Sequence, residues 1–89
     1  MTTMFVRHTV ADYAAWRVEY DALDATRTGM GVTGHAVWQA AGNPNDVTVT
    51  HDFASLDAAQ AFAASPELHD AMANAGVVGA PTIWFATRS

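Results

Sequence analysis

The sequence predicts a single α+β domain in which strands and helices follow the order βαββαβ. The prediction rests on a pattern that occurs twice in 89 residues: a strand-like run, an alanine-rich helical run and a second strand-like run. The first copy spans Met4–Val10, Asp12–Arg27 and Val32–Ala40, and the second spans Val47–Phe53, Leu56–Ala75 and Thr82–Thr87. Two such units form a four-stranded antiparallel sheet with both helical segments on one face. The other face is then bare, and we expect a partner to cover it.

Local sequence marks the first strand and the start of the first helix. Met4–Val10 separates into two alternating sets of side chains, and the apolar set includes Val6 and His8. A period of two is typical of a strand. Asp12 follows, and its carboxylate can accept hydrogen bonds from the free amides at a helix start.

The first helical run carries a stripe of large side chains. Spacings of three, four and three place its members on one helical face: Tyr13, Trp16, Tyr20 and Leu23. Gly29 and Gly31 end the helix, because glycine readily adopts the left-handed conformation of a C-cap.

The second strand, Val32–Ala40, also alternates. One set contains Trp38, which we expect in the layer between sheet and helices. The other contains His35, which we expect to face a partner subunit or solvent. Residues 41–46 are rich in turn formers and predict a hairpin connection.

The second copy contains two helix starts. Ser55 can cap the first piece, and Ser65, which is followed by proline, can cap the second. We therefore expect two helices with a bend between them, Leu56–Ala64 and Pro66–Ala75. The last strand, Thr82–Thr87, follows a glycine- and proline-containing connection.

Composition excludes several classes of function. The net charge is −5 and the chain has no lysine, so it lacks the clustered cations that nucleic acid or an anionic membrane surface requires. The absence of cysteine excludes disulfides, thiolate catalysis and cysteine metal sites. No apolar run approaches ~18 residues, and the N-terminus lacks the order of a signal peptide. We therefore expect a cytoplasmic protein.

Chain length allows one domain, residues 1–89. Hydrophobic residues make up 51% of the chain and charged residues 15%, against about 25% charged in an average domain. This apolar excess predicts a buried subunit interface and hence a homodimer. The alternative is that abundant alanine raises the apolar count without any interface.

Two histidines are the candidate catalytic residues. His8 and His51 fall on the apolar sets of the two strands expected at the centre of the sheet, so both imidazoles should point toward the helices. Two titratable rings in such a layer suit general acid–base catalysis, because burial lowers the histidine pKa and keeps a ring ready to accept a proton. The alternative is that each histidine bonds a neighbour and only fills the core.

We expect a flat cleft lined by aromatic rings around these histidines. Its candidate substrate-binding walls are Tyr13, Trp16, Tyr20 and Trp38, which could also be ordinary core residues. His69, on the last helix, could close one end of the cleft or lie on the helix surface. No histidine spacing matches a metal-ligand motif, so no metal is expected.

The opposite strand faces carry a candidate ion pair. Arg7 and Asp52 belong to the sets that point away from the helices. If two sheets stack in a dimer, both lie near its centre, where a buried arginine needs a paired charge. We interpret this pair as structural.

Three local motifs occur in order along the chain: Val10-x-Asp12-Tyr13-x-x-Trp16, the Asn43-Pro44-Asn45-Asp46-Val47 hairpin, and Ser65-Pro66-Glu67-Leu68 through Ala75-Gly76-Val77 to Pro81. With these motifs the chain resembles the small dimeric α/β-barrel proteins of the ferredoxin-like class. That superfamily includes antibiotic-biosynthesis monooxygenases and small polyketide cyclases. The resemblance implies a dimer whose two sheets close into a barrel and a cleft for flat polyphenolic molecules. Many members catalyse their reactions without metal or flavin, so the resemblance implies that no cofactor is needed.

We therefore expect a small-molecule-binding protein, and within that class an enzyme acting on an aromatic or polyketide-like substrate. It is either a cyclase, in which histidine moves protons during ring closure, or a monooxygenase that deprotonates a phenol so that oxygen can react. The first alternative is a non-catalytic ligand-binding or structural module. The second is a haem-binding or haem-degrading enzyme, because related family members use a helical histidine, and His69 is the only candidate here.

Overall fold

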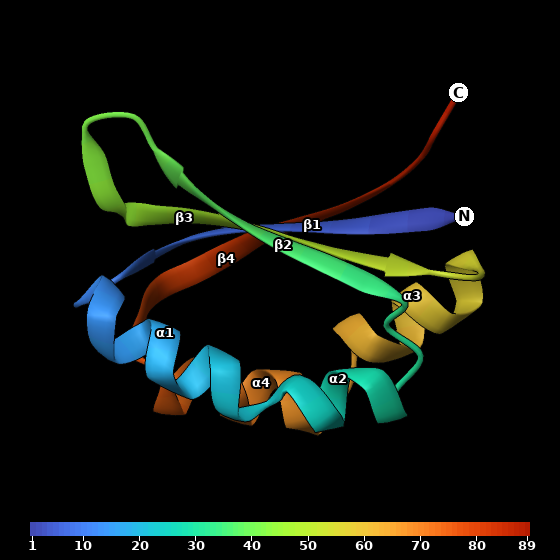
Figure 1. The fold of residues 1–89 in the computed structure, drawn as a ribbon, viewed down its shortest axis with the longest axis horizontal. Helices are drawn as coiled ribbons and strands as arrows, with labels where there is room; N and C mark the ends of the chain where they lie inside the picture. Colours follow the sequence, from blue (N-terminus) through green and yellow to red (C-terminus); the bar gives the residue numbers. More distant parts are fainter.

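The computed structural model describes residues 1–89. Its elements are β1 (Thr2–Val10), α1 (Tyr13–Ala22), α2 (Asp24–Gly29), β2 (Gly34–Ala40), β3 (Asn43–Phe53), α3 (Leu56–Ala63), α4 (Pro66–Asn74) and β4 (Val77–Thr87). The strands form one antiparallel sheet in the order β2-β3-β1-β4. All helices cover one face of this sheet, and its other face is bare (Figure 1). The predicted ferredoxin-like βαββαβ architecture is confirmed, with β1 and β3 at its centre.

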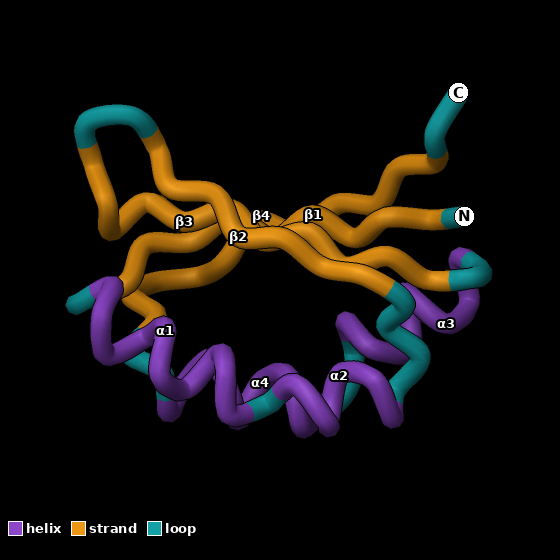
Figure 2. Tube along the Cα trace, viewed as in Figure 1, coloured by secondary structure: helices purple, strands orange, loops and turns teal.

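Several strands are longer than the sequence predicts. Strand β3 begins at Asn43, so the connection expected over residues 41–46 shrinks to a turn at Ala41 and Gly42. Gly42 has a φ of 85°, which glycine adopts without strain. The hairpin rises from the sheet on the side away from the helices (Figure 2). Turn-forming residues therefore continue a strand here, because pairing with neighbouring strands outweighs their local preference.

Helix α1 is capped by a residue distant in the sequence. Asp12 occupies the N-cap, but its side chain makes no capping bond. Instead, the Tyr13 amide donates to Oδ1 of Asn45 over 3.1 Å. The expectation that Asp12 supplies the cap is wrong, because the fold brings the start of β3 to the start of α1.

The first helical run is broken in two at Leu23. The amide of Leu23 donates a hydrogen bond to the carbonyl of Tyr20, three residues earlier, which is the tighter 3₁₀ pattern. The predicted single helix therefore becomes α1 and α2. No helix in the structure has the length and apolarity that crossing a membrane requires.

The two serine caps of the second unit are confirmed. Oγ of Ser55 accepts a hydrogen bond from the Ala58 amide over 3.2 Å, and Oγ of Ser65 accepts one from the Leu68 amide over 3.3 Å. Both caps act within one helical turn, so local sequence is sufficient to specify them.

The core consists of two apolar clusters. One lies against α3 and comprises Met4, Val6, Val32, Phe53, Ala59 and Phe62. The other lies against α1 and comprises Val10, Trp16, Tyr20, Val47 and Val49. The candidate functional site lies where members of both clusters meet.

The bare face of the sheet is rich in aromatic rings. Phe5 and Trp84 stack with ring centroids 5.2 Å apart and planes within 4° of parallel. Trp84 is 40% exposed and Trp38 is 62% exposed. Large exposed rings gathered on one face are typical of an interaction surface.

The ion pair on this face has a different acidic partner from the one expected. Arg7 donates two hydrogen bonds to Asp46, over 3.0 and 2.7 Å. The predicted pair with Asp52 is wrong, because the strand register places Arg7 opposite Thr48. Asp52 lies opposite Thr3 and accepts a 2.7 Å hydrogen bond from its hydroxyl.

Candidate functional site

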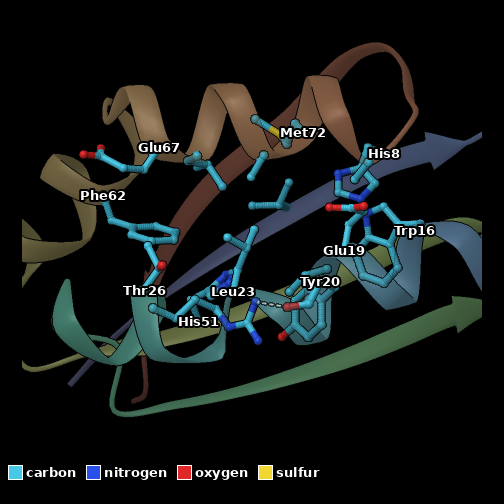
Figure 3. A pocket seen from close by; sticks show the side chains of 16 residues that line it. His8, Trp16, Glu19, Tyr20, Leu23, Thr26, His51, Phe62, Glu67 and Met72 are labelled. Atoms are coloured by element: carbon cyan, nitrogen blue, oxygen red, sulfur yellow. Dashed lines mark hydrogen bonds between the residues drawn. The ribbon is translucent and has the colours of Figure 1, made fainter.

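A cavity of about 70 Å³ lies between the sheet and the helices, roughly the space of five to seven water molecules. Side chains from the two central strands and from the helices converge on it (Figure 3). Ten of its sixteen lining residues are hydrophobic. The others are His8, Glu19, Thr26, Arg27, His51 and Glu67. This mostly apolar lining with a few polar groups is typical of small-molecule sites, but the cavity is smaller than their usual volume of about 300–1,000 Å³.

His8 lies on the inward set of β1, between Val6 and Val10, and pairs in regular register with Val47 of β3. The register between β1 and β4 shifts at His8. On the β4 side of this shift lie Gly79, whose φ is 74°, and Pro81, which has no amide hydrogen to donate to a ladder. The extra residues of this bulge are on β4, so the alternation of β1 is kept. The His8 side chain is buried, as expected, and neither ring nitrogen has a hydrogen-bond partner.

The His8 ring lies against the first helix. Its centroid is 5.7 Å from that of the Trp16 ring, in an edge-to-face arrangement. Burial lowers the pKa of His8 below its ordinary value. The imidazole is therefore neutral at neutral pH, and its lone pair is free to accept a proton.

His51 lies on β3 within the same layer. Its side chain is buried, its ring centroid is 5.2 Å from that of Phe62, and its Nδ1 has no hydrogen-bond partner. Burial lowers the pKa of His51 to about 4, and the positive charge of Arg27 acts in the same direction. This imidazole is also neutral at neutral pH.

The two histidines line one cavity at separate positions (Figure 3). The register pairs His51 with Met4, and His8 lies four positions farther along β1. From the rise of four residues and the spacing of neighbouring strands, their Cα atoms are roughly 14 Å apart. No hydrogen bond joins the rings.

The aromatic stripe of the first helix is only partly in the cavity wall. Trp16 and Tyr20 line it, with ring centroids 5.0 Å apart. Tyr13 is half-buried behind them, with its centroid 5.8 Å from that of Trp16, and does not line the cavity. The predicted wall is therefore right for two helical residues, and Tyr13 supports it from outside.

Two other residues expected at the cavity lie elsewhere. Trp38 is on the bare face of the sheet, opposite Thr48 in the register, so its predicted place in the wall is wrong. His69 is exposed on α4 and is not among the lining residues, so it does not close the cleft. Leu68 and Met72 of the same helix line the cavity instead. A haem ligand inside the cavity would therefore not come from His69.

His35 faces the helices, contrary to expectation. Its Nε2 lies 3.2 Å from Oδ1 of Asp24 and its Nδ1 lies 2.5 Å from the hydroxyl of Tyr20. Because a carboxylate only accepts, Nε2 carries the hydrogen and Nδ1 accepts from the tyrosine in the neutral ring. These bonds fasten the first helical layer to the edge strand β2.

Arg27 is a cavity residue that the sequence interpretation did not select. It is 5% exposed, and its guanidinium lies over the Tyr20 ring, with Cζ 3.9 Å from the centroid. One signal for it was present in the sequence. Arg27 lies four residues after Leu23 and so continues the spacing of the apolar stripe.

No group of three or more histidine, cysteine, aspartate or glutamate side chains in the structure could hold a metal ion. The titratable and charged side chains that line the cavity are two imidazoles, one guanidinium and the carboxyl groups of Glu19 and Glu67. Neutral imidazoles can remove a proton, and a guanidinium can stabilise the anion that results.

Comparison with known proteins identifies the fold. Solved structures that match include a provisionally named antibiotic biosynthesis monooxygenase from Bordetella bronchiseptica, with a TM-score of 0.85, 13% identity and coverage of 99% of this chain and 96% of that one. SnoaB, a cofactor-independent oxygenase from Streptomyces nogalater, matches with a TM-score of 0.77, 20% identity and coverage of 98% and 91%. No protein-family model and no curated protein matches the sequence.

The chain is also similar to a provisionally named antibiotic biosynthesis monooxygenase from Caulobacter crescentus, with a TM-score of 0.77, 18% identity and coverage of 99% and 89%. The resemblance inferred from the local motifs is therefore confirmed for the fold. At these identities, the similarity shows a shared architecture and leaves the reaction to be argued from the site.

We expect the stability of the protein to fall as the pH drops from about 6.5 to about 4, the range between the ordinary and the lowered pKa of His51. In that range the unfolded chain binds a proton that the folded chain does not. The full effect is about 3 kcal/mol of unfolding free energy, and His8 adds to it in the same direction.

Urea unfolding of the wild type and His51→Gln, at several pH values across this range, measures the effect. The variant should lose less stability than the wild type on acidification. Parallel pH dependences in the two proteins would show that His51 is not buried in its neutral form.

Proposed function

We propose that the protein is a cofactor-independent oxygenase acting on a small acidic aromatic molecule, such as a phenol or polyphenol. The observation that carries this proposal is the cavity itself, in which the buried rings of His8 and His51 leave ring nitrogens without any protein partner. Buried polar groups are almost always hydrogen-bonded. Their unpartnered nitrogens therefore favour a ligand that supplies the missing bonds.

The chemistry begins with proton removal. A neutral imidazole accepts the acidic proton of the substrate, and the resulting phenolate or enolate passes electrons to dioxygen. A C–O bond forms at a ring carbon, which loses its hydrogen to become a carbonyl group, the O–O bond breaks, and the second oxygen atom leaves as water. The apolar walls keep water from competing with this reaction. The description of SnoaB as a cofactor-independent oxygenase supports this choice, because that protein has the same fold.

A cyclase is the second candidate, since the same base could remove a proton next to a carbonyl group during ring closure. Dioxygen distinguishes the two reactions. A cyclase works at the same rate without oxygen, whereas an oxygenase stops.

A panel of single-ring phenols and dihydroxybenzenes tests the proposal, with oxygen uptake and product absorbance as readouts. We expect oxygen-dependent turnover of at least one phenol and none of its methyl ether, which has no acidic proton. Binding of the phenols without any turnover, in air or without oxygen, would favour the non-catalytic ligand-binding module.

We also propose that the bare sheet face joins two copies of the chain in a dimer. Its support is the group of rings on that face, formed by Phe5, Trp38 and Trp84. Two such faces stacked together would remove these rings from water, and symmetric dimers are the commonest oligomers.

We expect sedimentation equilibrium to give twice the chain mass of 9.5 kDa for the wild type and a single chain for Trp84→Glu. The glutamate would bury a charge in the interface. Val18→Glu is the matched control, because Val18 is an exposed apolar residue on α1, in the helical layer. A monomeric wild type, or a dimeric Trp84→Glu with the same affinity, would contradict the proposed interface.

A further inference from the structure

Arg27 is the one cationic side chain among the residues that line the cavity. The other basic groups there, His8 and His51, have lowered pKa values and are neutral at neutral pH. The two carboxylates, Glu19 and Glu67, belong to exposed residues and so remain in contact with water. Arg27 is therefore the buried charged side chain among the residues that line the cavity.

The guanidinium of Arg27 is held in one orientation. Its Nη1 donates a 2.6 Å hydrogen bond to the carbonyl of Tyr20, and its plane is held against the ring of that residue. Its Nη2 lies 3.6 Å from Oδ1 of Asp24. Tyr20 and Asp24 are themselves bonded to His35.

The remaining nitrogen has no partner. Nε of Arg27 is fully buried and forms no hydrogen bond. The residue as a whole is 5% exposed. Leaving a charged donor buried and unpaired is costly. A ligand with a suitable acceptor would remove this cost, and an anionic oxygen is the strongest acceptor for a guanidinium.

We propose that Arg27 binds an anionic oxygen of the ligand, a carboxylate or a phenolate, through Nε once the side chains that cover this atom move aside, and that the cavity therefore selects acidic aromatic molecules over neutral ones of the same shape. This inference rests on the proposed function in one respect, because it takes the cavity to be the substrate site. The cavity of about 70 Å³ is smaller than the engineered cavity of about 150 Å³ that binds benzene, so its side chains must shift to admit an aromatic ring.

An anion at this position would also act on His51. The positive charge of Arg27 lowers the pKa of this histidine, and an oxyanion bound to Arg27 would offset that charge. The imidazole would then become a stronger base when substrate is present.

Nitrogen NMR of the arginine side chains tests the proposal without any assumption about turnover. Benzoate and benzamide form a pair of equal shape that differs in charge, and 4-nitrophenol in mildly alkaline buffer and 4-nitroanisole form the corresponding phenolate pair. We expect the Nε–H signal of Arg27 to move on addition of benzoate or 4-nitrophenolate and to move little with the neutral partners. If neither anion moves it, or if benzamide binds as tightly as benzoate, the proposal is wrong.

Variants supply the second measurement. We expect Arg27→Gln to lose a preference for benzoate over benzamide of roughly tenfold or more, and Arg27→Lys to keep part of it. Arg17→Gln is the matched control, because Arg17 is a half-buried arginine on α1 that pairs with Asp21 and does not line the cavity, and its loss changes the net charge equally. An unchanged preference in Arg27→Gln, or an equal loss in Arg17→Gln, would overturn the assignment.

The outcomes also separate this inference from the proposed function. Anion selectivity that depends on Arg27, in a protein without turnover, would leave the binding site intact and remove the oxygenase. Turnover that does not depend on Arg27, in a protein without a preference for anions, would keep the oxygenase and remove the anion-binding role of Arg27.

Discussion

Replacing His51 with alanine is expected to lower the turnover of an active phenol by about 10²–10⁴-fold, the usual contribution of a general base. The reason is geometric as well as electrostatic. The ring is buried in the cavity wall, Nδ1 has no protein partner, and a lowered pKa keeps the ring unprotonated. Steady-state kinetics by oxygen uptake measures the effect.

His8→Ala is the companion experiment, because the two rings lie at separate positions in the cavity. If one of the two histidines is the base, its alanine variant should lose most of the turnover rate. The alanine variant of the other histidine should mainly alter the KM. His69→Ala is the control, since this histidine is exposed outside the cavity. Full activity in both His8→Ala and His51→Ala would remove histidine catalysis from the proposal.

The pH profile shows which ring is the base. The acid limb of kcat/KM reports the pKa of the base in the free enzyme. A limb near pH 4 that is lost in His51→Ala identifies His51, and a limb that is lost in His8→Ala identifies His8, whose pKa is also lowered by burial. A limb that persists in both histidine variants would point to a carboxylate of the cavity rim.

Phe53→Ala is expected to destabilise the protein by about 3–5 kcal/mol. Phe53 is 0% exposed and its ring centroid is 5.5 Å from that of Phe62. Both belong to the apolar cluster against α3, so the truncated side chain leaves a void that its neighbours can fill only in part. Because domains of this size are stable by only about 5–15 kcal/mol, we expect a large fall in the urea midpoint.

Leu56→Ala is the matched control for this substitution. Leu56 is an exposed apolar residue in the first turn of α3, and surface changes of this kind usually alter stability by no more than about 0.5 kcal/mol. Both proteins should be compared at one concentration, because a dimer adds a concentration-dependent term. A loss below about 1 kcal/mol in Phe53→Ala would show that the cluster rearranges to fill the void.

Arg27 and the two histidines together explain why the cavity is not simply filled core. Between the two apolar clusters lie polar side chains that a stable core would avoid. The free-energy cost of burying these polar side chains is lowest when a ligand supplies the hydrogen bonds that they lack. Sites that break the rules of core packing are where function is expected.

Much of the fold was predictable because its signals are local. The period of two in Met4–Val10 and the serine caps at Ser55 and Ser65 depend on residues within a few positions of each other. The inward orientation of His8 and His51 was also predictable, because each shares its set with apolar residues that the core requires.

The pattern of the second strand pointed to the wrong face. In Val32–Ala40 the set that contains Trp38 has no polar side chain, whereas the set that contains His35 is mostly polar. The structure nevertheless places His35 toward the helices and Trp38 on the bare face. Apolar character does not identify the core side here because the bare face also carries large apolar rings, and pairing with β3 decides the orientation.

By itself the sequence determined the order of elements, the central strands and the two inward histidines, since these follow from periodicity and short-range capping. Only the tertiary structure decided that Asn45 caps α1, that Arg7 pairs with Asp46 and that Arg27 is buried. Each of these depends on strand register or on contacts between residues far apart in the chain. A sequence pattern records which residues share a face, whereas register and packing decide what that face meets.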